Sequence, residues 1–379
     1  MSHFRRALRR HPRRGDLTGW GDLTPVPWSA EGVFTPDDAD PGDRLDYHTG
    51  TAYPQDAASQ VPVQLLDPQP GEIIVDTCAA PGSKTTQIGL RLGDDGLVVA
   101  CDASKQRRQV LVENLARQGV GCAVVTPMPV ETLAERFPGA ADAVLVDAPC
   151  SGHEERSDKQ VARMALRQLA LLTAVAPLVR AGGRLVYSTC TAYEAEDEGV
   201  ISQFLETHPA WRVAPRTLPG CGTDRRRLGG IRLTPEDQGT EPFFAILLEK
   251  PGDGLAAGFD GIEPTQDPGV PGFGWSRGNA RFLGSRQAAA AALPSEARGL
   301  LLGHGAKHDP WGDQGLIERG APAEVVDRAT ALRLWAGESV PGLVPDALVK
   351  TADGAPLGRL DGRGERLLMP SRMYRAGLR

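Results

Sequence analysis

The strongest constraint on the fold is a regular alternation of short β-branched runs with longer amphipathic stretches between residues 61 and 250. The runs at 72–76, 96–102, 122–125, 143–148, 184–189 and 242–250 predict strands, and the stretches at 84–92, 104–119, 159–180 and 198–209 predict helices. Alternating strands and helices form βαβ units, which build a mostly parallel sheet covered on both faces. We therefore predict an α/β fold over this region.

The flanking regions differ in composition from this α/β segment. Residues 251–280 are dense in Gly, Pro and Asp, so they cannot bury enough apolar surface to fold alone, and we predict a linker over 251–285. Beyond the linker, 286–302 and 323–337 have helical patterns, and 343–360 predicts short strands around a turn at Asp353-Gly354. We expect a smaller α+β domain over 286–379 and a separate basic region over 1–60.

Charge is distributed unevenly along this chain, whose formal net charge is −6. Arginines gather at both ends: Arg5, Arg6, Arg9, Arg10, Arg13 and Arg14, and then Arg359, Arg363, Arg366, Arg372, Arg375 and Arg379. Basic ends on an acidic protein favour an electrostatic grip on a polyanion such as RNA. Solvated tails are the alternative explanation.

The six cysteines all lie between Cys78 and Cys221, and none forms a Cys-x-x-Cys pair. This pattern favours neither a disulfide scaffold nor a zinc site, so we expect free thiols and no metal. The basic N-terminus lacks the apolar core of a secretion signal, and no apolar run reaches the length of a membrane span. We expect a cytosolic monomer that does not enter a membrane.

The segment 76–86 follows the first predicted strand and is built from small residues before a helix. In doubly wound sheets such a loop holds nucleotide-like ligands at the carboxyl ends of the strands. The loop has no Gly-x-Gly-x-x-Gly, and Cys78 and Ser83 stand where a phosphate-binding loop needs glycines. A phosphate-free adenosine ligand fits better. Asp102, at the end of the second strand, could accept hydrogen bonds from ribose hydroxyls or simply begin the next helix.

Two cysteines occur in similar settings further along. Cys150 follows Asp147-Ala148-Pro149 after the fourth strand, and Cys190 follows Ser188-Thr189 after the fifth. A buried cysteine usually serves packing. Two thiols that converge with Asp147 at the ligand edge indicate catalysis instead.

These residues resemble the RNA cytosine-5 methyltransferases of the Sun/Nop group. The similarity runs from His48 to Lys250 and includes Tyr53-x-Gln55-Asp56-x-x-Ser59, the loop from Asp76 to Thr85, Asp147-Ala-Pro-Cys150-Ser-Gly, Tyr187-Ser-Thr-Cys190-Thr, Glu196-Asp197-Glu198 (the family has Glu-Asn-Glu) and Phe243-Phe244-Ala245. The resemblance implies a Rossmann-like sheet that binds S-adenosylmethionine. The cofactor-binding residues it implies are Cys78, Ala79, Ala80, Pro81, Gly82, Ser83, Lys84, Asp102 and Asp147.

The resemblance also implies the catalytic roles. Cys190 is the nucleophile that adds to C6 of cytosine and makes C5 reactive towards the methyl group. Its thiolate is the reactive form, so we expect nearby donors to lower the pKa of Cys190. Cys150 assists release of the product, and Asp147 hydrogen-bonds the cytosine edge near N3. We interpret Lys84 as a backbone and cofactor position, not a general base.

The linker and C-terminal region further resemble the bacterial RsmF-type branch, which acts on small-subunit ribosomal RNA and has a PUA-like C-terminal domain. Gly354-Ala-Pro-Leu-Gly358 and the arginine-rich end carry this second likeness. The expected partner is therefore small-subunit ribosomal RNA or the small ribosomal subunit. A transfer RNA substrate, or a low-activity assembly factor that binds RNA, are the alternatives.

The chain departs from the family pattern at two places. Pro129 stands where many members have an Asp that holds the adenine amino group, so adenine would need backbone or apolar contacts, with Met128 as the candidate. The segment 153–164 is shorter than usual and lacks the Gly that commonly follows the Cys150 motif. The second departure leaves the choice of target cytosine open.

Overall fold

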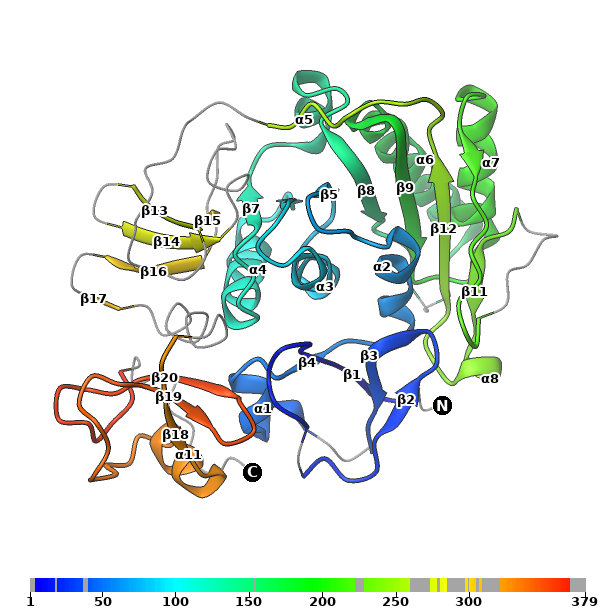
Figure 1. Ribbon diagram of the computed structural model, residues 1–379. Helices are drawn as coiled ribbons and strands as arrows, with labels where there is room; N and C mark the ends of the chain where they lie inside the picture. Colours follow the sequence, from blue (N-terminus) through cyan, green and yellow to red (C-terminus); the bar gives the residue numbers. More distant parts are fainter. Residues whose placement is uncertain are drawn as a thin grey trace.

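The structure is a computed structural model in which a large sheet-and-helix unit lies beside two smaller units (Figure 1). It describes residues 4–17, 19–36, 40–152, 155–221, 228–259 and 321–368, together with the backbone of five short strands between 273 and 308. The N-terminal strands and the C-terminal strands lie next to each other along one side of the large unit (Figure 1).

The described residues include a nine-stranded sheet in the order β10-β12-β9-β8-β5-β6-β7-β15, with β11 paired to β12. Its parallel centre consists of β5 (Ile73–Asp76), β6 (Leu97–Cys101), β7 (Ala123–Thr126), β8 (Ala141–Asp147) and β9 (Val179–Thr189). The antiparallel strands are β12 (Phe243–Glu249), β10 (Arg212–Val213), β11 (Ile231–Leu233) and β15 (Ala297–Arg298). The predicted α/β fold with a mostly parallel sheet is confirmed.

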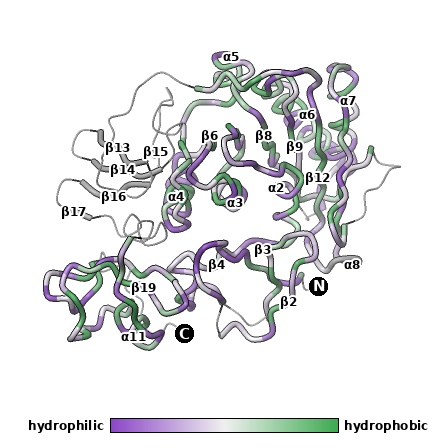
Figure 2. Tube along the Cα trace, in the orientation of Figure 1, coloured by the Kyte–Doolittle hydropathy of each residue, from purple (hydrophilic) through white to green (hydrophobic). Residues whose placement is uncertain are grey.

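Helices cover both faces of this sheet (Figure 1). One face carries α2 (Val61–Leu66), α3 (Ser83–Leu92) and α4 (Lys105–Arg117), and the other carries α5 (Val130–Arg136), α6 (Asp158–Val175) and α7 (Glu198–Thr207). Successive strand residues enter opposite cores: Ile74 faces the first set of helices and Val75 the second. Hydrophobic and hydrophilic residues are mixed along α6 and α7 (Figure 2), which is expected of helices with one buried side.

Helix α6 ends earlier than the sequence predicts. It gives way at Ala176 to the 3-10 helix η3 (Ala176–Leu178), and β9 begins at Val179. Pro177 explains the early end, because proline lacks an N–H and its ring clashes with the carbonyl one turn earlier in an α-helix.

Within the described part of the chain, Asp158–Leu178 is long and apolar enough to cross a membrane by length and composition. No apolar run of this length was expected from the sequence. Its residues Val161, Ala165, Leu172 and Val175 are buried in the core against the sheet and α7. The apolar side of this helix is therefore used for packing within the domain.

The N-terminal region forms a four-stranded antiparallel sheet in the order β2-β3-β1-β4. Its elements are β1 (Ala7–Arg10), β2 (Thr24–Val26), β3 (Ser29–Phe34), η1 (Pro41–Asp43), α1 (Leu45–His48), β4 (Ala52–Pro54) and η2 (Ala58–Gln60). The expectation of six arginines displayed to a polyanion is wrong for Arg9 and Arg14, which are buried inside the protein. Arg5, Arg6, Arg10 and Arg13 are exposed, as expected.

Arg9 ties this small sheet to the large one. Its guanidinium donates to Gln55 Oε1 and Ser83 O, both at 2.6 Å, and to Thr86 Oγ1 at 2.7 Å. Burial lowers the pKa of Arg9 to about 10, so the group stays charged at neutral pH. Strand alternation explains the inward position, because Arg9 shares a face of β1 with Ala7, which packs in a core of the large sheet, whereas Leu8 and Arg10 lie on the other face.

The C-terminal region differs in part from the predicted elements. Strands β13 (Phe273–Arg277) and β14 (Ala280–Gly284) lie inside the predicted linker, and they pair with β16 (Leu300–His304) and β17 (Lys307–His308) in one sheet. Gly278-Asn279 between two apolar runs is a hairpin signal that explains this difference. Of the predicted helix at 286–302, residues 286–296 and 299 lie outside the described residues, and β15 and β16 replace its end.

The last described unit pairs β18 (Glu324–Val326), β19 (Leu348–Thr351) and β20 (Pro356–Arg359) in one sheet beside α11 (Arg328–Trp335). The predicted helix at 323–337 begins only at Arg328, because the side chain of Asp327 accepts from Thr330 N at 2.7 Å and caps it there. The predicted strands around Asp353-Gly354 are confirmed. The PUA-like identity and the domain boundaries stay predictions.

The buried Arg9 leads to a prediction about stability. We expect Arg9→Met to lower the free energy of unfolding by about 3 kcal/mol, because Gln55 Oε1 and Ser83 O would lose their buried donor. The exposed neighbour is the matched control: Arg10→Met should change stability by less than about 0.5 kcal/mol. Denaturant unfolding followed by circular dichroism measures both, and equal effects would contradict the structural role.

Candidate functional site

The loop after β5 is held by a buried carboxylate. Asp76 accepts from Thr85 Oγ1 at 2.7 Å and from Cys78 N at 3.4 Å, and burial raises the pKa of Asp76 to about 7. The next amide, Ala79 N, donates to Cys101 O at 2.8 Å across the sheet. These bonds fix the backbone of the predicted cofactor loop against the ends of β5 and β6.

Helix α3 starts immediately after this loop. Gly82 precedes it with a φ of +112°, which is in the left-handed region that favours glycine. A Cβ at this position would also lie 2.9 Å from Leu111 Cδ1 of α4. The sequence Gly82-Ser83-Lys84 therefore turns the chain sharply and places Lys84 on the first turn of α3.

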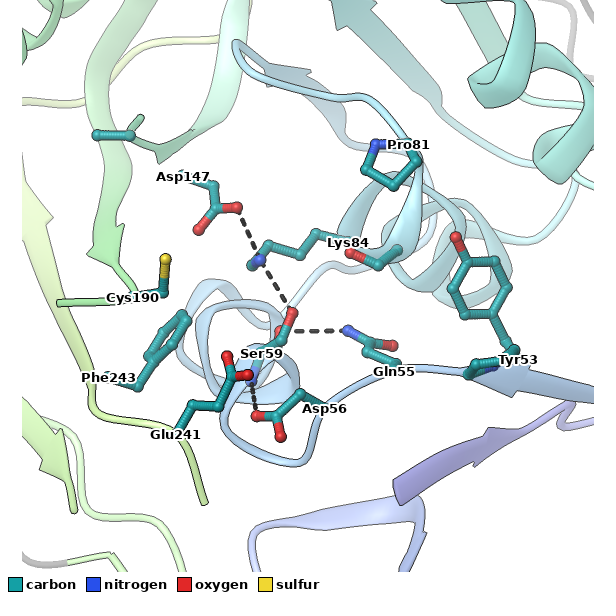
Figure 3. Close-up of a pocket in the computed structure, with 13 residues that line it drawn as sticks. Tyr53, Gln55, Asp56, Ser59, Pro81, Lys84, Asp147, Cys190, Glu241 and Phe243 are labelled. Carbon is teal, nitrogen blue, oxygen red and sulfur yellow. Dashed lines mark hydrogen bonds and ion pairs between the residues drawn. The ribbon is translucent and has the colours of Figure 1, made fainter. Parts of the chain in front are cut away.

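Lys84 lies at the centre of the site (Figure 3). Its Nζ contacts Asp147 Oδ2 at 2.7 Å and donates to Ser59 Oγ at 3.0 Å, and the residue is only 6% exposed. Asp147, at the end of β8, also accepts from Ser188 Oγ of β9 at 2.7 Å. The interpretation of Lys84 as a backbone and cofactor position is thus incomplete, because its ammonium group takes part in the site itself.

The structure brings the two predicted catalytic thiols together. Cys150 Sγ and Cys190 Sγ are 3.0 Å apart as free cysteines, and Cys190 N lies 3.3 Å from Cys150 Sγ. Parallel pairing of β8 with β9 places Asp147 opposite Ser188, so the segments that follow these strands meet at one edge. Of the two thiols, Cys190 lines the cavity beside Lys84.

The expected lowering of the Cys190 pKa is wrong for this state of the protein. One hydrogen bond joins the two thiols, and either sulfur can be its donor; this bond together with burial raises the pKa of Cys190. The same bond lowers the pKa of Cys150, which also accepts from the backbone N–H groups of Gly152 and Cys190. When one thiol of the pair ionises, these interactions favour the charge on Cys150 over Cys190.

A cavity of about 360 Å³ opens between the N-terminal residues and the edge of the large sheet. Its lining residues are Tyr53, Pro54, Gln55, Asp56, Ser59, Pro81, Ser83, Lys84, Asp147, Ala148, Cys190, Glu241 and Phe243 (Figure 3). The upstream motif from Tyr53 to Ser59 supplies one wall, and Glu241 and Phe243, just before and at the start of β12, supply another.

Sequence reasoning did not assign site roles to Asp56, Ser59, Glu241 or Phe243. Asp56 accepts from Ala58 N at 2.8 Å, and burial together with the nearby Glu241 raises the pKa of Asp56 to about 6. Lys84 lies 5.6 Å from the centre of the Phe243 ring. The Tyr53-to-Ser59 motif was visible in the sequence, but its place beside Cys190 required the fold.

The two predicted adenosine contacts are less direct. Asp102 Oδ1 accepts from Ser104 N at 2.9 Å, and Oδ2 pairs with Arg107 at 3.1 Å, so both oxygens have partners within the protein. Met128 is half-buried against the core that contains Val130. The ribose contact of Asp102 and the adenine contact of Met128 stay predictions.

The other cysteines have surroundings that suit packing. Cys101, Cys122 and Cys221 are buried, and burial raises the pKa of Cys221 to about 12. Cys78 is half-buried, and burial raises its pKa to about 12 as well. Within the described residues, their mutual hydrogen bond therefore distinguishes Cys150 and Cys190 from the remaining thiols.

The chain is similar to known RNA methyltransferases. A family described as 16S rRNA methyltransferase RsmB/F matches residues 63–249. A tRNA (cytosine(49)-C(5))-methyltransferase of Pyrococcus abyssi is 34% identical over 252 residues, covering 61% of this chain and 81% of that protein. The chain belongs to the RNA cytosine-5 methyltransferase family.

Another relative in this family is the ribosomal RNA small subunit methyltransferase F of Klebsiella pneumoniae. It is 33% identical over 313 residues, covering 77% of this chain and 62% of that protein. The chain spans about half of the corresponding Escherichia coli proteins, 52% of their length at 34% identity.

Solved structures of the family share the fold. A methyltransferase homologue from Pyrococcus horikoshii has a TM-score of 0.59 at 28% identity, covering 65% of this chain and 87% of that one. NSun6 from Pyrococcus horikoshii with SFG has a TM-score of 0.52 at 31% identity, covering 56% of each chain. The Rossmann-like methyltransferase sheet predicted from the resemblance is thereby confirmed.

The thiol hydrogen bond leads to a prediction about reactivity. We expect iodoacetamide to alkylate Cys150 before Cys190, with a rate that rises through a pKa below 9.0, because the pKa of Cys150 is lowered and that of Cys190 is raised. Cys190→Ala removes the strongest donor to Cys150 and should shift this titration to higher pH. Mass spectrometry of the peptides across a pH series measures both effects.

The buried Cys221 provides the control for this experiment. Cys221→Ala should leave the Cys150 titration unchanged, because Cys221 is buried in the core and is not among the groups that shift the pKa of Cys150 or Cys190. Alkylation of Cys190 first, or an unchanged Cys150 titration in Cys190→Ala, would contradict the charge assignment.

Proposed function

We propose that this protein methylates C5 of cytosine in RNA with S-adenosylmethionine, through a covalent bond between Cys190 and C6. The observation that carries the proposal is the thiol pair, 3.0 Å apart, beside the ion pair of Lys84 and Asp147 at the wall of a cavity. Cytosine C5 is a weak nucleophile, and a thiol added at C6 converts the ring into an enamine that reacts at C5. This chemistry requires a nucleophile and a proton acceptor together.

Cys190 is the nucleophile because it lines the cavity, and Cys150 is the group placed to receive its proton. As Cys190 Sγ bonds to C6, its proton passes to the Cys150 thiolate. The charge that was held on Cys150 thereby moves onto the cytosine ring. A raised pKa for Cys190 in the free protein is compatible with this role, since the proton leaves only when the base arrives.

Lys84 and Asp147 would receive the polar edge of the base. The Lys84 ammonium can donate to N3 or O2, where negative charge develops after addition at C6. The Asp147 carboxylate can accept from the neighbouring exocyclic amino group, which cytosine has and uracil lacks. Their direct contact at 2.7 Å holds both groups ready in the absence of substrate.

The negative charge on the ring is used when C5 takes up the methyl group, and release then completes the cycle. The C5 proton leaves to a solvent base, the electrons of the C5–H bond restore the C5–C6 double bond, and the electrons of the Cys190–C6 bond return to sulfur. The departing Cys190 sulfur takes back the proton held by Cys150 as this bond breaks. The pair returns to its starting state, with the charge on Cys150.

The residues present fit the expected cofactor. The carboxyl ends of β5 and β6 meet at the loop Cys78–Lys84, where small residues leave the main chain approachable, and Asp102 offers a carboxylate for ribose hydroxyls. S-adenosylmethionine supplies an electrophilic methyl group carried on a positive sulfur. The related NSun6 was solved with SFG, an analogue of this cofactor, which supports the assignment.

Small-subunit ribosomal RNA is the substrate we propose first. The C-terminal strands and α11 extend beyond the methyltransferase unit, and the Klebsiella relative, aligned over 77% of this chain, is named for small-subunit ribosomal RNA. Transfer RNA is the second candidate, since the Pyrococcus abyssi relative is named for it. The cytosolic location, the monomeric state and the low-activity alternative stay predictions.

A methyl-transfer assay tests the function. The protein is incubated with labelled S-adenosylmethionine and small ribosomal subunits, free ribosomal RNA or transfer RNA. We expect label at cytosine C5 in RNA, with the ribosomal substrates preferred. Absence of label from all three substrates would refute the proposed methyltransferase activity. Label in transfer RNA alone would make transfer RNA the substrate in place of ribosomal RNA.

Two cysteine variants test the assigned roles. Cys190→Ala should abolish transfer, whereas Cys150→Ala should accumulate an RNA–protein adduct that survives denaturation. Without Cys150, Cys190 can still lose its proton to water as it adds to C6, but the proton that Cys150 returns to the departing sulfur would be missing. Gel analysis of denatured samples measures the adduct. Retained transfer in Cys190→Ala, with loss of transfer and no adduct in Cys150→Ala, would reverse the roles.

Lys84 provides a further prediction. We expect Lys84→Met to lower kcat by about 100-fold, because the ring charge formed after addition would lose its nearest cation. Lys105→Met, at the start of α4, is the control and should retain activity. Single-turnover kinetics on saturating RNA measure the step, and a normal kcat in Lys84→Met would rule out the charge-stabilising role.

A further inference from the structure

Glu196 is a fully buried acid beside the thiol pair. It ends the 3-10 helix η4 (Glu194–Glu196) and is 0% exposed. Its Oε2 accepts from Ser151 N at 3.0 Å and from Gln168 Nε2 at 2.8 Å. Ser151 is the residue directly after Cys150, so one carboxylate oxygen holds the backbone next to the proposed proton acceptor.

Gln168 extends this hold to the other side of Cys150. It is buried on α6, and its Nε2 also donates to Pro149 O at 2.9 Å. Glu196 therefore holds the backbone of both residues that flank Cys150: Ser151 directly, and Pro149 through Gln168. The main chain of Glu196 is itself fixed, because Tyr187 of β9 donates its hydroxyl to Glu196 O at 2.6 Å.

The buried carboxylate of Glu196 destabilises the folded protein. Its second oxygen, Oε1, is buried without a hydrogen-bond partner among the described residues. The nearby Arg232 pairs instead with Asp197 and Glu198, each at 2.8 Å. Because a buried, incompletely bonded carboxylate destabilises a protein relative to an apolar side chain, packing alone does not account for an acid at this position.

We propose that Glu196 is the positioning residue that holds Cys150 within reach of Cys190, by clamping the backbone on both sides of Cys150. The placement of the thiol stands on the geometry alone, whereas its effect on release of the RNA rests on the proposed function. Glu196 touches neither substrate nor cofactor in this role. It acts through Ser151 and Gln168.

The first test needs no RNA and measures the position of Cys150 through its titration. In the intact clamp, Cys150 accepts from the Cys190 thiol and from the Gly152 and Cys190 backbone. Glu196→Ala should free the loop, weaken these bonds and raise the alkylation pKa of Cys150 by about one unit. Glu196→Gln should restore the original value, because its amide oxygen can accept from the same two donors.

Glu198→Ala is the matched control. Glu198 is a buried acid two residues along the chain, and its side chain accepts from Arg232, so this variant disturbs the same segment without touching the Cys150 loop. It should leave the Cys150 titration unchanged. If circular dichroism shows that Glu196→Ala does not fold, Gln168→Leu is the test variant instead. Leucine removes the hydrogen bond to Pro149 O and suits a buried position of α6.

The second test measures the consequence for catalysis. Glu196→Ala should transfer methyl groups yet leave a fraction of RNA in a denaturation-resistant adduct about tenfold above that of the unchanged protein. Glu196→Gln and Glu198→Ala should not. A role in folding alone would lower transfer and adduct together, so the ratio of adduct to transferred methyl separates the two roles.

The outcomes are distinguishable from failure of the proposed function. An unchanged Cys150 titration in Glu196→Ala and Gln168→Leu, or an equal shift in Glu198→Ala, overturns the clamp whatever the enzyme does. If Glu196→Ala shifts the Cys150 titration, but neither Glu196→Ala nor Cys150→Ala accumulates adduct, the clamp is supported and the release role of Cys150 is refuted. If Glu196→Ala shifts the titration without accumulating adduct, whereas Cys150→Ala does trap RNA, the catalytic consequence of the clamp is overturned.

Discussion

Parallel pairing of β8 with β9 is the constraint on which the site depends. Parallel strands end at the same edge of a sheet, so Asp147 lies opposite Ser188, and the two segments that follow emerge side by side. Cys150 and Cys190 are forty positions apart in the chain, yet their sulfurs lie 3.0 Å apart. At this separation the ionisation of one thiol changes the pKa of the other, so the two titrate as a pair.

The N-terminal region completes the site from the other side. Ser59 accepts from Lys84, while the buried Arg9 links Gln55 of the upstream motif to Ser83 at the start of α3. The cavity beside Cys190 therefore lies between two units that a buried guanidinium holds together. This arrangement explains why an arginine in a basic terminal cluster became part of the interior, and why the smaller sheet belongs to the catalytic site as well as to its surroundings.

The sequence allowed prediction of the strands of the large sheet, the cofactor loop and both thiols, because hydrophobic period and small-residue turns are local properties. It failed where position depended on neighbours. The inward direction of Arg9, the strands within the predicted linker and the raised pKa of Cys190 each depend on groups distant in the chain. The places of Glu241 and Phe243 in the site were missed for the same reason, because no local sequence feature indicates that β12 lies beside Cys190.

The sequence by itself determined the fold class and the chemical groups available: a parallel sheet, a loop suited to an adenosine ligand, and two thiols with an acid after adjacent strands. Only the tertiary structure decided how charge and protons are distributed among those groups. The pKa of Cys150 is lowered because Cys190 and backbone N–H groups stabilise its ionised form, and Lys84 pairs with Asp147 because the start of α3 and the end of β8 meet in the fold. Hydrogen bonds and electrostatic interactions act between atoms that are close in space, and the order of residues does not state those distances.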